Sequence, residues 1–489
     1  MDKFVSPMLN IRRSLFINFF ASTGGTFINF AVSLFLARLL SPSDIGVYSM
    51  TIVFVNIAHI FRDFGVGSYL QREENLTQEK LRAATGVLFT TSWLLAAAMY
   101  AGSNWFGTWF NEPRMIPVTK VLAICFAFIP FASISSSLLT REFAAGKQAW
   151  VTAVSTVTSS VTCIGLAVMG CGTMSMAWAQ LASIIACCLV HIPLRPKYLP
   201  WLPSLKHWRD VVHFGISSLL TNCLSSVNNS IPDILLGKLG NATSVGLFSR
   251  ANSTVNIFFH IAGNTANYGS VSYLAQAHHR GESVGELLNK ATVLLTGVAW
   301  TALALTYIFA TEIITVLYGE KWLRSVPAMD GLLVACAVGT VFNYYPAAMT
   351  AIGRPYLAAF PSAVTLLSRI AFAFALFDGS IRSFSWVICA ATVIATPVIF
   401  IQQRIYLHHR LSTILVALWP SAAVAMICMA GAALLKASFP ASSTPVSVLL
   451  VSATPLACLW YLSVRAVGHP LTVEIHKVAS GFQGLVAQR

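Results

Sequence analysis

The residues of this chain that could do chemistry are ionisable side chains inside long apolar stretches. Arg369 and His260 lie deep in such stretches, and Arg250 and Asp233 lie nearer the ends of theirs. Charges within a membrane are costly and commonly mark a pathway for substrate or ions. A guanidinium there can hold a phosphate through two hydrogen bonds. We therefore predict that Arg250 and Arg369 bind an anionic group. For Arg250 and Asp233, a structural ion pair or side chains that snorkel from a helix end to the interface explain the sequence equally well.

Asparagine, serine and threonine side chains recur on one face of each of four expected helices. Because each helical residue turns by about 100°, spacing assigns residues to faces. Polar groups that face lipid go unsatisfied, so these faces are expected to turn inward and line a hydrated cavity. The alternative is that they join helices in a closed bundle. The predicted cavity residues, besides the two arginines, are Asn29, Asn56, Asn222, Asn229, Asn256 and His260.

Two pairs of neighbouring residues are candidates for gating or coupling. Pro232 directly precedes Asp233, and a proline within a helix frees a carbonyl group and permits a bend. Arg62 and Asp63 lie together at the end of an expected helix, where charges solvated at the interface are the alternative. Further prolines expected inside helices are Pro130, Pro346, Pro361 and Pro397.

The elements that must position these residues are membrane helices. Of the 489 residues, 56% are apolar and 10% are charged, with a mean hydropathy of +0.71. Apolar runs of membrane-spanning length recur throughout, so we predict an all-α polytopic membrane protein. The fourteen expected helices cover residues 14–40, 46–62, 83–103, 118–140, 149–169, 174–193, 211–236, 244–268, 290–312, 326–351, 357–377, 384–403, 412–435 and 445–465.

The net charge of +14 is explained by membrane topology. The basic residues are dispersed among short loops, so we expect no nucleic-acid partner. An even number of helices places both termini on one side, and the loops of that side hold more Lys and Arg, as in 195–209. The positive-inside rule then predicts that both termini are cytoplasmic.

The sequence contains no motif of a nucleotide or metal site. It has no glycine-rich phosphate loop, no Walker lysine and no His/Cys cluster with metal-ligand spacing. The ten cysteines nearly all lie in apolar runs, where they are expected to pack between helices. We predict no cofactor, no metal and no catalytic residue.

A segment near the start of the chain recurs 200 residues later. Residues 37–49 match residues 237–249, with Gly46 answering to Gly246 and Ser49 to Ser249. Such a fixed offset indicates a parallel repeat of six helices. We predict an N-terminal lobe at 1–193, a cytoplasmic linker at 194–210, a C-terminal lobe at 211–403, and two extra helices with a tail at 404–489.

The repeated segment also resembles a known family. Together with 63–67, 141–143 and 233–240, it is similar to Wzx-type oligosaccharide flippases. These form the polysaccharide-export branch of the multidrug/oligosaccharidyl-lipid/polysaccharide (MOP) superfamily, and the resemblance covers about residues 10–465. It implies two six-helix lobes, with the first, second, seventh and eighth helices at a central cavity. It also implies export of a polyprenyl-diphosphate-linked oligosaccharide to the outer leaflet of a bacterial inner membrane, for assembly of a surface polysaccharide.

Two other functions compete with a flippase. The first is an ion-coupled multidrug exporter, whose cationic cargo would favour cavity carboxylates, yet Asp233 is the one strong candidate. The second is a membrane-embedded polysaccharide polymerase or acyltransferase, which would need catalytic groups on sizeable outer loops. The outer loops here are short, so we expect a transporter and not an enzyme. Besides the saccharide and membrane lipids, H⁺ or Na⁺ and a polysaccharide polymerase are the expected partners.

Overall fold

The structure is a computed structural model. It describes residues 24–63, 66–67, 70, 77–142, 144–196, 199, 203–204, 208–257, 270–409, 411–440 and 442–477, with the backbone alone at 209–222, 225 and 411. Within these ranges the chain is helical and forms no strand. The predicted all-α fold is confirmed.

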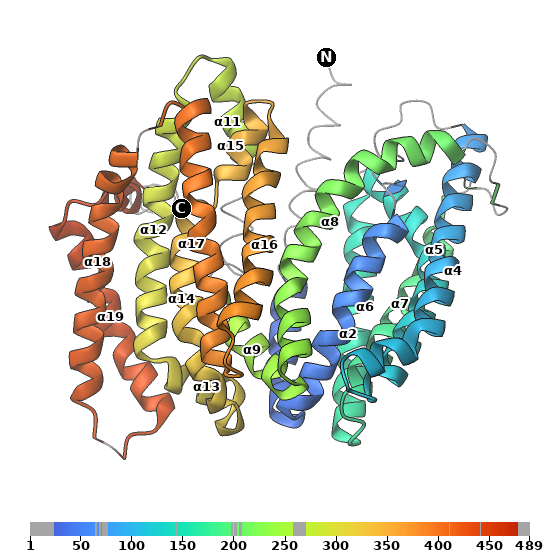
Figure 1. Cartoon of the computed structure of the whole chain (residues 1–489), viewed down its shortest axis with the longest axis horizontal. Helices are drawn as coiled ribbons and strands as arrows, with labels where there is room; N and C mark the ends of the chain where they lie inside the picture. The colour runs from blue at the N-terminus through green and yellow to red at the C-terminus, as the bar shows by residue number, and fades with distance from the viewer. Residues whose placement is uncertain are drawn as a thin grey trace, which may run out of the picture. The chain divides into compact units, whose positions relative to one another are not determined.

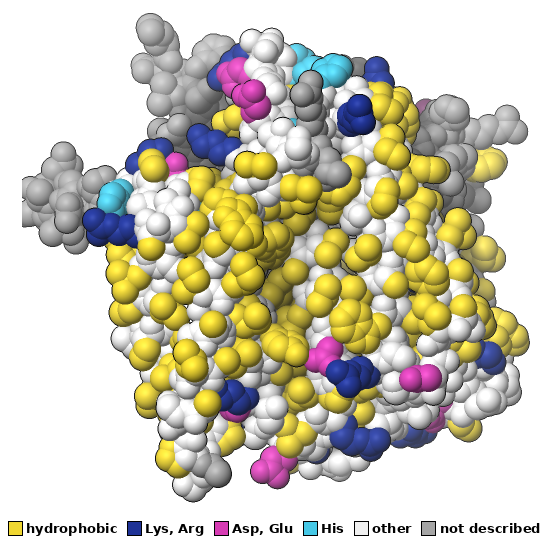
Figure 2. All heavy atoms as spheres, turned by 60° about the vertical axis from the view of Figure 1, so that its left-hand side comes forward, with side chains coloured by type: hydrophobic (Ala, Val, Ile, Leu, Met, Phe, Trp, Pro, Cys, Tyr) yellow, Lys and Arg dark blue, Asp and Glu magenta, His cyan; other side chains and the backbone are white. Residues whose placement is uncertain are grey.

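Eleven helices of the described part are long and apolar enough to cross a membrane. Three further helices lie where the other three expected ones begin: Gly24–Leu39, α8 (Trp208–Leu239) and α9 (Ala242–Val255). On the face in Figure 2, hydrophobic side chains form a broad band, and charged side chains gather beyond its two edges. Side chains that face lipid must be apolar, so this distribution is that of a multi-pass membrane protein.

By contacts the chain divides into two compact units, Met1–Gly246 (unit 1) and Leu247–Arg489 (unit 2). In unit 1, α4 packs on α5, α6 on α7, and α8 on α2 (Figure 1). The division lies after α8, whereas the predicted lobes follow the repeat, so the lobe boundaries stay a prediction. The labelled helices of unit 1 are α2 (Pro42–Asp63), α4 (Gln78–Trp109), α5 (Met115–Arg141), α6 (Ala145–Val168), α7 (Met174–Leu194) and α8 (Trp208–Leu239).

The two copies of the repeated segment begin α2 and α9 (Ala242–Val255) in the same way. The Ser41 hydroxyl accepts a hydrogen bond from the Asp44 N–H at 3.2 Å, and the Asn241 side chain accepts one from the Ser244 N–H at 2.9 Å. Such caps satisfy free N–H groups at a helix start. Residues 200 positions apart therefore perform the same task.

The repeated glycines meet at these helix starts. A Cβ atom on Gly46 would lie 1.7 Å from the Ala242 carbonyl oxygen, and one on Gly246 would lie 1.9 Å from that of Pro42. The two backbones approach so closely that no side chain fits between them. The sequence match thus corresponds to a reciprocal contact in space.

Unit 2 contains the remaining helices. Here α12 packs on α18, and α17 packs on both α14 and α16 (Figure 1). The labelled helices that follow α9 are α11 (Ser270–His279), α12 (Val284–Ile308), α13 (Ala310–Tyr318), η2 (Glu320–Ser325), α14 (Val326–Val341), α15 (Tyr345–Ala351), η3 (Pro355–Ala358), α16 (Ala359–Leu376), α17 (Ile381–Tyr406), α18 (Leu411–Ala437) and α19 (Pro445–Ala466).

One expected helix is divided, and this corrects the sequence prediction. The stretch 326–351 forms α14 and α15, separated by a turn at 342–344. Pro346 therefore stands in the first turn of α15, where its missing N–H costs no helical hydrogen bond. By contrast, Pro130, Pro232 and Pro397 lie inside their helices as predicted.

Candidate functional site

Unit 1 contains a polar cavity of about 570 Å³ among α2, α5, α6 and α7. Its polar lining consists mainly of serine hydroxyl, glutamine amide and histidine imidazole groups. Ile129, Ala132, Val151 and Ile184 supply apolar patches between them. The volume is within the usual range for small-molecule sites, about 300–1,000 Å³. The cavity can therefore hold a compact polar molecule.

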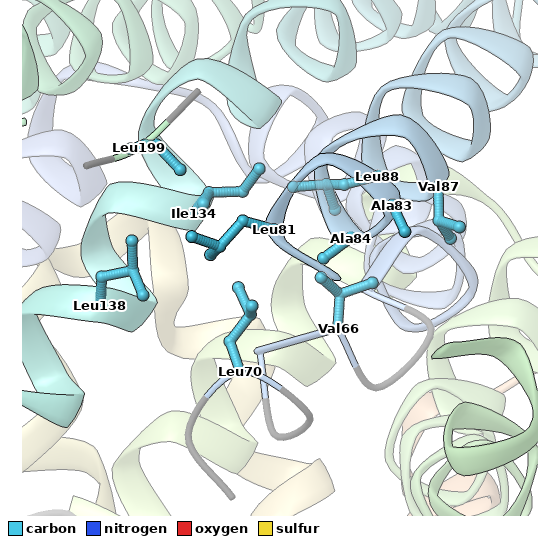
Figure 3. Close-up of a cluster of buried hydrophobic side chains, with 10 residues drawn as sticks. All are labelled: Val66, Leu70, Leu81, Ala83, Ala84, Val87, Leu88, Ile134, Leu138 and Leu199. Atoms are coloured by element: carbon cyan, nitrogen blue, oxygen red, sulfur yellow. The ribbon is translucent and has the colours of Figure 1, made fainter. Parts of the chain in front are cut away.

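The helix α5 lies between this cavity and the buried core, with one face toward each. Ile134 and Leu138 belong to a buried cluster in which they lie beside Leu81 (Figure 3). Ser133 and Ser136, on the other side of the same turns, line the cavity. Core packing on one face fixes the rotation of α5, so the serines are held toward the cavity.

One face of α7 forms the opposite wall. Gln180, Ile184, Cys187 and His191 recur every three or four residues and all line the cavity. His191 is 2% exposed, and its Nδ1 lies 2.8 Å from the Cys187 carbonyl oxygen. This hydrogen bond fixes the orientation of the ring.

The predicted gating pair Arg62–Asp63 lies on the cavity lining. The Arg62 Nε donates a hydrogen bond to Asp63 Oδ1 at 3.1 Å, and the two side chains form an ion pair. The Arg62 side chain is 10% exposed, whereas that of Asp63 is 56% exposed. Thr91 on α4 also donates to the Arg62 carbonyl at 3.1 Å. The end of α2 is therefore held by both charge and backbone contacts.

Three of the predicted cavity asparagines, Asn29, Asn56 and Asn229, are exposed. None of the three is buried between helices, as residues that join a closed bundle would be. Their helices are Gly24–Leu39, α2 and α8. The side chain of Asn222 and all of His260 lie outside the described residues.

In unit 2, Arg250 lies beside two aromatic rings. Its guanidinium carbon is 5.6 Å from the centre of the Tyr318 ring and 5.8 Å from that of Trp322. Both distances are typical of cation–π contacts. The Thr254 hydroxyl, one turn further along α9, lies 3.4 Å from the Tyr318 hydroxyl oxygen. The aromatic residues therefore hold the guanidinium plane in a defined place.

The remaining predicted residues are half-buried. Arg369 lies in the middle of α16, and Asp233 follows Pro232 inside α8. Asn256 donates to the Asn252 carbonyl at 2.8 Å, one turn earlier. Their part in binding or gating stays a prediction.

A serine and a histidine also meet in unit 2. The Ser421 hydroxyl lies 2.9 Å from Nε2 of His469, and His469 Nδ1 accepts a hydrogen bond from the Leu471 N–H at 3.1 Å. A neutral histidine that accepts at Nδ1 carries its proton on Nε2, so it donates to Ser421. A base that activates a serine needs the reverse arrangement. This pair therefore stabilises the packing of α18.

The cavity residues of α5, α6 and α7 were missed by sequence reasoning, which considered only polar faces on helices paired by the repeat. A signal was present: Gln180, Cys187 and His191 are spaced by seven and four residues, which places them on one helical face. The serines of α5 show a similar spacing. The spacing of these residues therefore indicates a shared polar face on α7 and on α5.

A family model described as polysaccharide biosynthesis protein matches residues 35–327, more than half of the chain. The chain belongs to this family. It is 22% identical over 351 residues to the teichuronic acid biosynthesis protein TuaB of Bacillus subtilis (strain 168), covering 69% of this chain and 70% of TuaB. It is 18% identical over 319 residues to the lipopolysaccharide biosynthesis protein WzxC of Escherichia coli (strain K12), covering 63% of each.

The fold of this polysaccharide biosynthesis family member is also found in a lipid II flippase. The structure of MurJ in an inward closed conformation superposes with a TM-score of 0.75 at 13% identity, covering 94% of this chain and 99% of MurJ. The predicted membrane-transporter fold is thus confirmed, and so is the predicted family.

Proposed function

We propose that this protein is a flippase that moves a polyprenyl-diphosphate-linked oligosaccharide from the inner to the outer leaflet of a bacterial inner membrane. Both termini would be cytoplasmic. The family, the relatives named for polysaccharide synthesis and the flippase fold support this function. Alternating access of the two predicted lobes about the linker 194–210 would carry the sugar across.

The exposed asparagines carry this proposal. Asn56 lies in the middle of α2, a helix apolar enough to span the membrane, and it is nevertheless exposed. Asn29 and Asn229 are also exposed. Amides exposed to lipid would lose their hydrogen bonds, so these side chains are better explained by contact with water or sugar hydroxyls.

The charged end of the cargo would be bound by Arg250 and Arg369. A diphosphate offers several acceptor oxygens that suit the planar donors of a guanidinium. The rings of Tyr318 and Trp322 would fix the Arg250 guanidinium before the cargo arrives. Asp233 is the candidate for coupling to H⁺ or Na⁺, and a polysaccharide polymerase would take over the exported saccharide.

The test is transport by Arg369 variants in membrane vesicles that contain the lipid-linked saccharide of the host. Arg369→Ala should abolish translocation at unchanged protein level, and Arg369→Lys should retain part of it because the charge remains. Arg382→Ala is the matched control, since this exposed arginine pairs with Asp330 at 3.0 Å. It should transport as the wild type does.

A structural ion pair is the competing explanation for Arg369. If adding Asp233→Ala restores the transport lost in Arg369→Ala, the two residues stabilise each other and the assignment to the diphosphate is wrong. If the wild type moves no lipid-linked saccharide at all, the proposed function itself fails.

A further inference from the structure

The polar cavity of unit 1 contains a histidine nitrogen that accepts no hydrogen bond from the described part of the chain. His191 Nδ1 lies 2.8 Å from the Cys187 carbonyl oxygen, and a carbonyl can only accept. The Cys187 thiol, 3.6 Å from the same Nδ1, is a weak hydrogen-bonding group. The proton of the neutral ring is therefore on Nδ1, and Nε2 presents a free lone pair.

Nε2 of His191 is buried and has no hydrogen-bond partner among the described residues. A buried polar atom without a partner costs free energy, so such an atom in a native structure requires an explanation. His191 lines the cavity, so a bound molecule that carries a donor is the partner that the site offers to Nε2 once the ring turns toward it. A hydroxyl group is such a donor.

The facing wall offers groups that both donate and accept. The Gln148 side chain on α6 contacts the Ser136 hydroxyl, with its amide nitrogen 3.1 Å from that oxygen. One hydroxyl cannot use all the donors and acceptors of an amide. Gln148 thus retains capacity for groups that donate and accept, as sugar hydroxyls do. The Gln180 amide lines the cavity from α7, on the same face as His191, and offers the same kinds of group.

The charges of the cavity favour a neutral ligand. Arg62 and Asp63 form an ion pair at the lining, so their formal charges cancel. Ile129 and Ile184 add apolar surface that suits the C–H groups of a sugar ring. An acidic ligand would find no unpaired cation among the described lining residues, because Arg62, the one Lys or Arg there, is already paired.

We propose that this cavity binds a neutral glycosyl unit of the transported saccharide, with a sugar hydroxyl donating to Nε2 of His191 and others bonding to Gln148 and Gln180. The inference rests on the proposed function and adds to it a sugar-binding site inside unit 1. This site is separate from the arginines assigned to the diphosphate.

Cys187 and Cys188 provide a matched pair of reporters. Cys187 lines the cavity, whereas the Cys188 thiol donates to the Phe128 carbonyl at 3.2 Å and is not part of the lining. Two variants that each keep one of these cysteines, with the other nine replaced by serine, are labelled with a small polar thiol reagent. The probe is the saccharide that mild acid releases from the lipid-linked pool of the host.

Saturating saccharide should slow labelling of Cys187 about tenfold and leave Cys188 unchanged. His191→Leu or Gln148→Leu should each weaken this protection about tenfold, in line with the loss of one good hydrogen bond to the ligand. Both variants should also slow transport of the intact lipid-linked saccharide. Ser155→Ala is the control, because Ser155 and Ser183 join α6 and α7 at 2.7 Å outside the cavity. It should behave as the wild type does.

The possible failures are distinguishable. If the wild type transports the saccharide but Cys187 is not protected, the cavity is not a sugar site and the proposed function stands. The same conclusion follows if His191→Leu and Gln148→Leu bind and transport normally. If Ser155→Ala is as impaired as these variants, their effect is due to helix packing, which also overturns the inference.

Discussion

Unit 1 and unit 2 pack corresponding helices in the same way but differ in what these helices enclose. By order in the repeat, α5, α6 and α7 correspond to α14–α15, α16 and α17. In both units the last of these helices packs on the other two. In unit 1 these helices enclose the polar cavity beside the buried cluster of Leu81, Ile134 and Leu138, whereas in unit 2 α15 lies in a buried cluster that includes Leu274, Leu288, Tyr345 and Met349.

Polar side chains also make different contacts beside the unit 2 cluster and in the unit 1 cavity. In unit 2 the Tyr345 hydroxyl donates to Gln402, which in turn donates to the Leu357 carbonyl at 3.3 Å. In unit 1, Nε2 of His191 has no partner among the described residues. Polar groups that satisfy one another stabilise a fold, and those with unused capacity can bind a ligand. The cavity around His191 and the contact between Tyr345 and Gln402 therefore differ in how their polar groups are used, although the surrounding helices pack alike.

The largest expected effect tests what the two copies share. Gly46→Leu and Gly246→Leu should each destabilise the protein by at least about 3 kcal/mol, because a side chain would overlap backbone atoms that cannot rotate away. The thermal unfolding midpoint, measured in detergent, should fall by a similar amount in both variants, since the contact is reciprocal. Gly165→Ala on α6 has open space around it and should be neutral or stabilise by up to about 1 kcal/mol. Unequal losses would show that the copies are not equivalent there.

The second prediction concerns the cavity and the cluster. Ser136→Leu should fold normally and lower transport about tenfold or more, because it fills space that is empty in the protein. Ala348→Leu in α15 should cost about 1–3 kcal/mol of stability, because Ala348 is fully buried in a packed cluster. Thermal unfolding midpoints report the stability of the two variants, and transport in membrane vesicles reports their activity. Equal destabilisation would mean that the space beside Ser136 is packed as tightly as the cluster around Ala348.

A smaller effect is expected from single hydroxyl groups. Tyr345→Phe should lower the free energy of unfolding by about 0.5–1.5 kcal/mol, because Gln402 loses a buried partner. Ser137→Ala should cost less than about 0.5 kcal/mol, because within the described ranges its hydroxyl bonds, at 3.1 Å, to the Ser133 carbonyl of its own helix alone. A larger cost for Ser137→Ala than for Tyr345→Phe would contradict the view that the Tyr345 hydroxyl stabilises the fold more than the cavity hydroxyl does.

The smallest effect is pH-dependent and lies outside the membrane helices, in the connection between α4 and α5. Arg114 donates to Glu112 at 2.8 Å, and this hydrogen bond lowers the pKa of Glu112. A carboxyl whose pKa is lower in the folded state stabilises above its unfolded pKa, about 4.3, and this stabilisation is lost as the pH falls through the folded value. Since Arg114 is half-exposed, Glu112→Gln should cost under about 1 kcal/mol at pH 7, and this cost should shrink as the pH falls below about 4.3. A constant difference across this pH range would contradict the assigned cause.

Much of the architecture could be predicted from the sequence. Apolar runs fix the membrane helices because the bilayer demands continuous apolar length and internal hydrogen bonding, which are local properties of a sequence. The offset of 200 residues predicted a repeat, and the caps at Ser41 and Asn241 and the paired glycines agree with it. The break before Pro346 was missed because a proline in an apolar run fits a kink or a helix start equally well.

The site depended on tertiary structure. Arg62 could be predicted as a site residue because a charge next to an apolar run stands out in the sequence. Its place beside the polar faces of α5 and α7 could not be predicted. Those faces come from helices that begin more than 50 residues after the end of α2, and only the packing of the helices decides that they enclose space. The free lone pair of His191 likewise depends on which atom its ring meets. Sequence periodicity determines which side chains share a face of one helix, whereas the meeting of faces from different helices is decided by how the helices pack.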